Sequence, residues 1–229
     1  MRVLALETSS ETASVALWID GECRTLSRAG ARGHSDHLLA MVEELLAVAQ
    51  LGCAQLDGLA CGVGPGAFTG VRIAVSVAQG MAMARDIPIA PVVSLEALAE
   101  AAAATRVYAC IDARMGQVYV AAYERAGDQW QDIVAPCLAD TQAPPLPHGP
   151  WVAVGSGLKA LAVEQLARID ASEMRRDAYP GAEAVASLGA ARLALGQGVD
   201  AALAAPLYLR DKVALDVREQ AARRAARAA

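Results

Sequence analysis

A long stretch without charge most constrains how this chain can fold. After a glycine-rich loop at residues 62–68, residues 70–85 have the periodicity of a helix, and no charged side chain lies between Arg72 and Arg85. Small residues alternate with large apolar ones along this stretch. A helix without a polar face is normally buried all round. This helix therefore needs cover, either from the rest of its own domain or from a partner.

The composition indicates a globular protein of one large or two small domains. The chain has 229 residues, of which 55% are hydrophobic and 20% are charged, so it can bury a core of its own. Its longest uncharged stretch contains polar residues, and its first residues form too short an apolar run for a signal peptide. Five cysteines form no C-x-x-C pair, which suits a reducing compartment and argues against a disulfide framework or a zinc site. We expect a cytoplasmic protein without a membrane segment.

The charge balance argues against RNA binding by the chain alone. The net charge is −5, whereas a domain that binds RNA unaided usually carries a basic face. The clearest basic cluster lies near the C-terminus and comprises Arg218, Arg223, Arg224 and Arg227. Two interpretations of this cluster stay open: a solvated helix end, or a contact with RNA or another partner.

The first half of the chain opens with three expected strands. They lie at residues 2–6, 13–19 and 22–28, and Asp20-Gly21 predicts a hairpin turn between the last two. The later elements of this half alternate between helix and strand. They are expected at residues 35–50 (helix), 56–61 (strand), 70–85 (helix, with Thr69 as its N-cap), 87–93 (strand) and 94–104 (helix).

The second half begins at Thr105, where the pattern restarts with strands. This divides the chain into an N-terminal domain at residues 1–104 and a C-terminal domain at residues 105–229. The expected elements are strands at 106–111, 117–123, 129–135 and 151–154, a proline-rich loop at 141–150, a helix at 158–169, and a helix from about 182 to 195. Because both halves start with strands and continue in alternation, the sequence predicts a duplicated α/β fold.

The glycine-rich loop invites comparison with nucleotide sites. Gly62-x-Gly64-x-x-Ala67 matches the G-x-G-x-x-G/A pattern of dinucleotide sites, after a strand and before a helix. The context does not fit, because Pro65 lies inside the turn and three strands precede the motif. The loop also lacks the G-K-[ST] of a Walker A site. We favour a tight glycine turn that lets two backbone segments pack closely.

Glu7-Thr8-Ser9-Ser10 follows the first strand and could cradle a phosphate through its hydroxyl and backbone N–H groups. In the actin, Hsp70 and sugar-kinase fold this turn holds D-x-G-[ST]. An acidic residue is kept here, but Ser9 stands where glycine would let the backbone approach a phosphate.

The corresponding turn of the second half runs from Asp112 to Gly116. Arg114 and Met115 are bulky where a phosphate loop needs glycine. Gly155-Ser156-Gly157 matches a remnant of an adenosine-binding turn. These incomplete motifs favour the actin, Hsp70 and sugar-kinase fold more than they favour ATP-dependent activity. No bound cofactor is expected.

His34 and His37 stand three residues apart at an expected helix start, a spacing that can place two imidazoles on one face as metal ligands. No third histidine or cysteine ligand lies nearby in the sequence, so capping and surface roles are favoured and no metal site is expected. The chain has no G-x-S-x-G nucleophile elbow.

A nine-residue segment carries a specific resemblance. It runs Gly64-Pro65-Gly66-Ala67-Phe68-Thr69-Gly70-Val71-Arg72. This segment resembles the G-P-G-S-F-T-G-L-R signature of the TsaB (YeaZ) family, with Ala67 in place of serine. Weaker matches occur in family order along nearly the whole chain. They are Glu7-Thr8-Ser9, His34-Ser35, the segment at 112–119, and Pro206-Leu207-Tyr208-Leu209-Arg210.

The resemblance implies a two-domain fold of the actin/Hsp70/sugar-kinase (ASKHA) type in a bacterial protein of tRNA threonylcarbamoyladenosine synthesis. It implies a non-catalytic subunit that binds and activates TsaD, the homologous transferase that modifies tRNA next to the anticodon. It also implies the ATPase TsaE in the complex, tRNA contact only through the complex, and a homodimer when the chain is alone. TsaD-like proteins hold metal through H-x-x-x-H, but His34 and His37 have a different spacing and Leu38 occupies the last position.

We expect the two apolar helices to form the partner interface with their outer faces. The expected interface residues are Leu38, Met41, Val42, Leu45, Arg72, Ile73, Val77 and Met81. The alternative is an ATP-dependent enzyme that uses the turn at Glu7 for phosphate. A peptidase is a third and weaker alternative, because the sequence marks no nucleophile.

Overall fold

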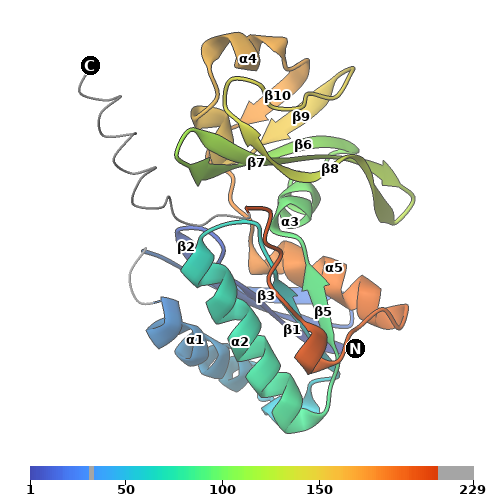
Figure 1. Cartoon of the computed structure of the whole chain (residues 1–229). Coiled ribbons are helices and arrows are strands. Elements are labelled where there is room, and N and C mark those ends of the chain that lie inside the picture. The colour runs from blue at the N-terminus through green and yellow to red at the C-terminus, as the bar shows by residue number, and fades with distance from the viewer. Residues whose placement is uncertain (31–33, 211–229) are drawn as a thin grey trace, which may run out of the picture.

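The computed structural model describes residues 1–30 and 34–210, and in it two β-sheets lie one above the other (Figure 1). The arginine-rich cluster at residues 218–227 lies outside the described residues. Among the helices of the described part, none is both long and apolar enough to cross a membrane.

The first sheet has five strands in the order β3-β2-β1-β4-β5. Its strands are β1 (Arg2–Glu7), β2 (Thr12–Ile19), β3 (Glu22–Ala29), β4 (Gly58–Gly62) and β5 (Ile89–Val92). The β1-β2 and β2-β3 pairs are antiparallel, and the β1-β4 and β4-β5 pairs are parallel. Asp20 and Gly21 both have positive φ angles, of 49° and 101°, as a tight hairpin turn requires.

The second sheet repeats this arrangement, with the order β8-β7-β6-β9-β10. Its strands are β6 (Arg106–Arg114), β7 (Gln117–Ala126), β8 (Gln129–Asp140), β9 (Trp151–Val154) and β10 (Ala171–Arg175). Three strands again form an antiparallel meander, and two follow in parallel to its first strand. The expected two-domain fold with duplicated mixed sheets is therefore confirmed.

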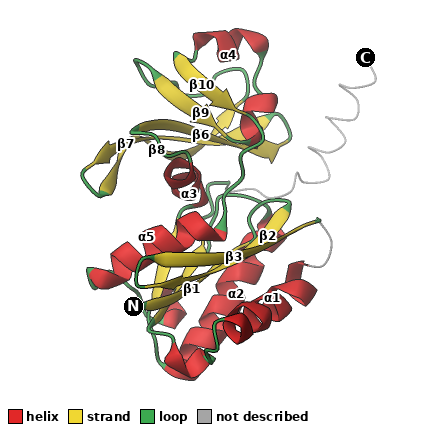
Figure 2. Cartoon of the chain, turned by 180° about the vertical axis from the view of Figure 1, so that it is seen from behind, coloured by secondary structure: helices red, strands yellow, loops and turns green. Residues whose placement is uncertain are grey.

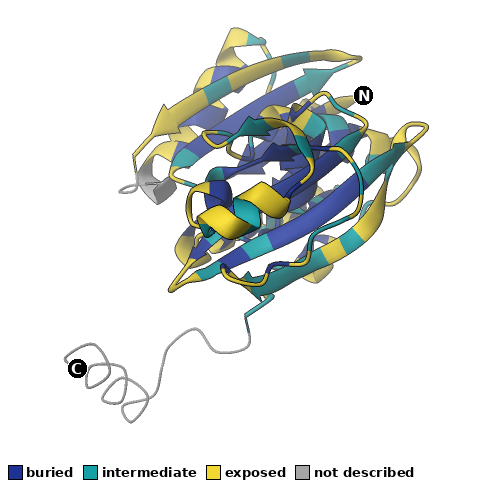
Figure 3. Cartoon of the chain, turned by 90° about the horizontal axis from the view of Figure 1, so that it is seen from above, coloured by how far each residue is buried: buried dark blue, intermediate teal, exposed yellow. Residues whose placement is uncertain are grey.

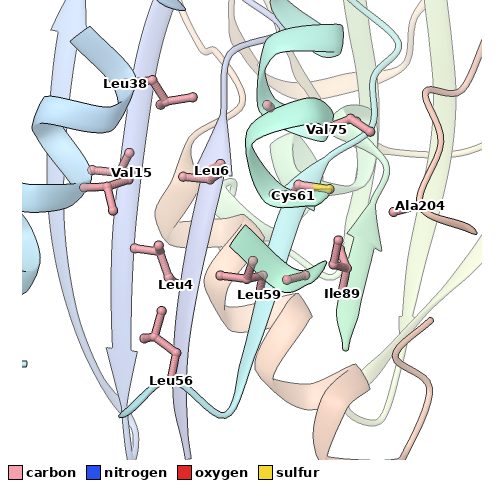
Figure 4. Close-up of a cluster of buried hydrophobic side chains, with 14 of the residues drawn as sticks. Leu4, Leu6, Val15, Leu38, Leu56, Leu59, Cys61, Val75, Ile89 and Ala204 are labelled. Carbon is pink, nitrogen blue, oxygen red and sulfur yellow. The ribbon is translucent and has the colours of Figure 1, made fainter. Parts of the chain in front are cut away.

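Helices α1 (His34–Val48) and α2 (Phe68–Arg85) cover one face of the first sheet. Alternation along β1 sends Leu4 and Leu6 to this face, where they are fully buried with side chains of both helices (Figure 4). Each such leucine contributes roughly 1.5–3 kcal/mol through burial. This core covers one face of the charge-free helix, and its outward face stays exposed.

Four of the expected interface residues belong to this core. Leu38, Met41, Val42 and Leu45 are at most 3% exposed and pack against the chain's own sheet. The expectation that they lie on an outer face is wrong. An apolar stripe looks the same in the sequence whether a sheet or a partner covers it.

The opposite face of the first sheet is covered by α5 (Ala182–Ala194). Val3 and Ala5 lie there against a helix rich in alanine. Gly189 lets α5 approach closely, because a Cβ at that position would lie less than 3.0 Å from the Cβ of Ala60. Residues 182–194 thus pack on the first sheet, although the division at Thr105 assigns them to the second domain.

Helix α3 (Ser94–Ala101) lies between the two sheets (Figure 2). Its Leu95 and Leu98 join a cluster with inward side chains of β6 and β7. Glu100 Oε2 accepts hydrogen bonds from Arg125 Nη2 (2.8 Å) and Trp130 Nε1 (2.9 Å). Its Oε1 accepts one from Ser187 Oγ at 3.1 Å. The carboxylate thereby ties α3 to β7, β8 and α5.

Two elements of the second half differ from expectation. The helix expected at 158–169 is split into a 3₁₀ turn (Ser156–Lys159) and the short helix α4 (Val163–Arg168). The chain then forms β10, which the sequence did not predict. Burial is concentrated in the inner strands, and the outward residues of helices and edge strands are exposed (Figure 3).

Candidate functional site

The turn after β1 is buried and occupied by the chain itself. Glu7 is fully buried, and its Oε1 accepts a hydrogen bond from the Ser9 backbone N–H at 2.6 Å. Its Oε2 accepts one from Ser94 Oγ at 2.9 Å, at the first turn of α3. Burial raises the pKa of Glu7, although these hydrogen bonds oppose the shift. Both carboxylate oxygens therefore have partners within the protein.

The glycine-rich loop packs directly on this turn. A Cβ at Gly66 would lie less than 3.0 Å from the carbonyl oxygen of Ser9, and one at Gly70 would meet the carbonyl oxygen of Thr8 as closely. Thr8 Oγ1 donates a hydrogen bond to the Gly70 carbonyl oxygen at 2.6 Å, and the Ala67 N–H donates one to the Ser9 carbonyl oxygen at 2.7 Å. The geometry supports close backbone packing as the role of these glycines.

Helix α2 begins at Phe68, two residues before its expected start. Ala67 is the N-cap, with no side-chain cap, and Thr69 lies inside the first turn instead of capping it. The backbone contact between Ala67 and Ser9 fixes where the helix starts, and this contact has no sequence signal.

The turn after β6 is open by comparison. Arg114, Met115 and Gly116 have consecutive positive φ angles of 62°, 60° and 78° at the tip of the β6-β7 hairpin. The Arg114 N–H donates to Asp112 Oδ1 at 2.8 Å. Arg114 also pairs with Glu11 of the first domain at 3.2 Å, and both side chains are exposed.

A cleft of about 780 Å³ lies between these two turns. It opens where the strands of both sheets end, the usual ligand position in open α/β sheets. Its polar lining includes Ser9, Glu11, Asp112, Ser156 and Lys159. The sequence placed the two turns in separate halves, and the structure brings them to opposite walls of one cleft.

The late motif at residues 206–210 completes the cleft. The Leu207 N–H donates to the Val63 carbonyl oxygen at 2.8 Å, which binds this segment to the first domain. Arg210 Nη2 donates to the Ala113 carbonyl oxygen at 2.9 Å, which connects it to the second. Sequence reasoning noted this motif only by resemblance and did not predict its contact with the signature loop.

Three side chains of the two motifs contact one another beside the cleft, and two of them, Phe68 and Tyr208, line it. The guanidinium carbon of Arg72 lies 3.3 Å from the ring centre of Phe68 and 5.1 Å from that of Tyr208. The two ring centres are 6.0 Å apart. We call Phe68, Arg72 and Tyr208 the aromatic clamp.

The other expected site residues are distributed as follows. Ile73, Val77 and Met81 lie four residues apart on α2 and are partly buried against the first core. His37 is exposed, and the His34 side chain is outside the described part. Within the described residues, no three His, Cys, Asp or Glu side chains gather as a metal site would require.

Comparison with known proteins places the chain in a family. Residues 27–221 match the family model described as TsaD, tRNA N6-adenosine threonylcarbamoyltransferase. The chain is 36% identical to the Escherichia coli protein TsaB over 93% of its own length and 96% of that protein's. The chain belongs to the TsaB (YeaZ) family. The Haemophilus influenzae TsaB is 34% identical, with 93% and 95% of the two chains covered.

Solved structures of the family agree with the fold. The crystal structure described as an uncharacterized protein with similarity to peptidase YEAZ, from Pseudomonas aeruginosa, superposes with a TM-score of 0.84 at 35% identity. It covers 91% of this chain and 99% of the other. A second structure, YeaZ from the same organism, gives a TM-score of 0.83.

Proposed function

We propose that this TsaB-family chain is a non-catalytic subunit that binds and activates a TsaD-family transferase, which forms threonylcarbamoyladenosine next to the tRNA anticodon. The observation that carries the proposal is the state of the two turns that face the cleft. In each, the acidic side chain accepts the N–H of the residue two positions later, so that N–H is not free to bind a phosphate. The name of the Escherichia coli and Haemophilus influenzae relatives, tRNA threonylcarbamoyladenosine biosynthesis protein, supports the pathway.

The outward face of α1 and α2 is the proposed partner interface. Ser76 and Gly80 are exposed on α2, and a Cβ at Gly80 would meet nothing within 4 Å. Such a flat ridge lets another helix approach closely. Leu39 and Val48 of α1 and Met83 of α2 are exposed apolar residues of the same two helices. In the proposed interface, these exposed residues replace the four buried residues of α1 that the sequence suggested. Arg72, Ile73, Val77 and Met81 stay in the proposal.

The assembly follows from this face. Without its transferase, the same surface of two copies would meet across a two-fold axis as a homodimer. The transferase, and with it the TsaE ATPase, would replace one copy. The net charge of −5 gives the isolated chain little attraction for tRNA, which supports tRNA contact only within the complex. The complex would act in the cytoplasm.

The test is reconstitution with the cognate TsaD-family protein. We expect co-purification and tRNA modification that depends on the added chain. Ser76→Glu should abolish both, because it places a charge in the helix contact. Ser27→Glu, an exposed serine on the edge strand β3, is the matched control and should leave both unchanged. Failure of the wild-type chain to bind the transferase would overturn the proposal.

An ATP-dependent enzyme is the competing outcome. ATP turnover by the isolated chain that disappears in Glu7→Ala would support that alternative. We expect turnover at background, since the Glu7 carboxylate is fully buried and both of its oxygens accept hydrogen bonds.

A further inference from the structure

The aromatic clamp holds an arginine against two exposed rings that line the cleft. Phe68 and Tyr208 remain 42% and 51% exposed, although the Arg72 guanidinium lies over the Phe68 ring and beside the Tyr208 ring. Within the described residues, no acidic side chain lies within 4.0 Å of Arg72. Contact with the two rings restricts the Arg72 side chain, and no acceptor among the described residues pairs with its N–H donors.

A planar guanidinium with ordered faces and free edge donors is suited to a carboxylate. Carboxylates and phosphates accept two parallel N–H bonds from arginine, and such charge-assisted pairs are stronger than neutral ones. Ordering the side chain in advance lowers the entropy lost on binding. The clamp is thus a preorganised receptor for a planar anion.

The surroundings favour a carboxylate on a polypeptide over a nucleic-acid backbone. The cleft lined by both rings carries charges of both signs, with Glu11 and Asp112 beside Arg114, Lys159 and Arg210, so it is not the uniformly basic groove that tracks a nucleic-acid backbone. Met115 is 45% exposed, and its sulfur lies 3.3 Å from Arg210 Nη1. Exposed aromatic rings, methionine and arginine together have the composition of protein-interface hot spots.

We propose that Arg72, held by Phe68 and Tyr208, receives an aspartate or glutamate carboxylate of the TsaD-family partner, with apolar partner residues seated on the exposed rings. This inference rests on the proposed function and adds a specific contact to it. The clamp stands at the start of α2, so the contact would extend the helical interface to the cleft.

The test measures the dissociation constant between full-length chain variants and the cognate TsaD-family protein. Arg72→Ala should weaken binding by roughly 10- to 100-fold, as expected for loss of a hot-spot arginine. Arg72→Lys should lose about as much, because lysine lacks the planar two-donor edge. Arg24→Ala, an exposed arginine on β3, is the matched control and should bind like the wild type.

The stack itself is tested by Tyr208→Leu, which keeps an apolar side chain and removes one ring. It should weaken binding by about 3- to 10-fold while the arginine stays in place. The carboxylate is tested by charge exchange: Arg72→Glu should lose binding and regain it with a partner in which one acidic residue is changed to arginine.

The outcomes separate the two proposals. If the wild-type chain does not bind the transferase, the proposed function fails. If it binds and both Arg72 variants bind equally well, only the clamp proposal is overturned. It is also overturned if the Arg72 variants keep transferase binding and weaken only the binding of tRNA to the complex, because the anion would then be a phosphate.

Discussion

The turn after β1 and the turn after β6 occupy equivalent positions in two sheets of the same strand order, yet one is buried and the other is exposed. Their local chemistry is alike. Glu7 accepts the N–H of Ser9, and Asp112 accepts the N–H of Arg114, in each case two residues later. The acid therefore sets the shape of each turn by the same short-range hydrogen bond.

The difference comes from the glycine-bearing loop that packs on each turn. In the first domain Gly66 and Gly70 press on the carbonyl groups of the turn itself. In the second domain Gly155 and Gly157 press on the backbone around Cys110, which precedes Asp112 and leaves the turn uncovered. Whether each turn is buried therefore depends on where the glycine-bearing loop packs, and the residues of the turn itself do not determine it.

The largest expected effect is on the covered turn. Gly70→Ala should lower the free energy of unfolding by about 3 kcal/mol or more, because the new Cβ would meet the Thr8 carbonyl oxygen. Gly80→Ala on the same helix has open space and should raise it by roughly 0.5–1 kcal/mol. Urea denaturation of both variants measures the contrast. Equal midpoints would show that the loop does not press on the turn.

A second contrast tests which face of α1 is covered. Leu38→Ala should cost about 2–5 kcal/mol, because the side chain is fully buried. Leu39 is 51% exposed, and Leu39→Ala should change stability by no more than about 0.5 kcal/mol. Thermal unfolding of the two neighbours decides the matter. A costly Leu39→Ala with a tolerated Leu38→Ala would reverse the assigned faces.

The buried acid predicts a pH dependence. Burial raises the pKa of Glu7 above its ordinary value of 4.5, so the folded chain keeps this proton to higher pH than the unfolded chain. Its contribution to stability is complete below 4.5 and declines as the pH rises through the folded-state value. Glu7→Gln should flatten this decline. Unfolding free energies measured from pH 4 upward test it, and parallel curves for the two proteins would contradict it.

The smallest expected effect concerns the exposed turn. Met115 and Gly116 form the two-residue loop of the hairpin with positive φ at both positions, where Asn-Gly is favoured. Met115→Asn should therefore raise the unfolding free energy by about 0.5 kcal/mol. The urea midpoint of this variant provides the measurement. A clear loss would mean that the Met115 contact with Arg210 contributes more than the strained backbone costs.

The sequence predicted the elements that depend on local patterns. The hairpin at Asp20-Gly21 and the strand at Trp151–Val154 follow from turn residues and apolar runs, and both were confirmed. The strand Ala171–Arg175 was missed, because its partly exposed polar residues resemble a loop. Its order comes from parallel pairing with β9, which is a tertiary contact.

The site was predictable in its residues and not in its arrangement. The glycine-rich loop at residues 62–68 indicated close backbone packing, but nothing in the pattern named Ser9 as the neighbour or gave Gly70 the same role. The stack of Arg72 on Tyr208 joins residues 136 positions apart. A pairing over that separation depends on the path of the whole chain, so local periodicity carries no trace of it.

The late return of the chain to the first sheet has a consequence for its synthesis. The apolar face formed by Val3, Ala5 and Ala60 is covered by α5, and Tyr208 reaches the first domain later still. Once residues 1–92 have left the ribosome, all five strands of the first sheet are available while one of its faces is still bare. That face must wait for residues 182–194 to leave the exit tunnel, and until then the nascent chain presents a surface that chaperones recognise. The time for which this face of the first sheet stays uncovered therefore depends on how fast the second half of the chain is translated.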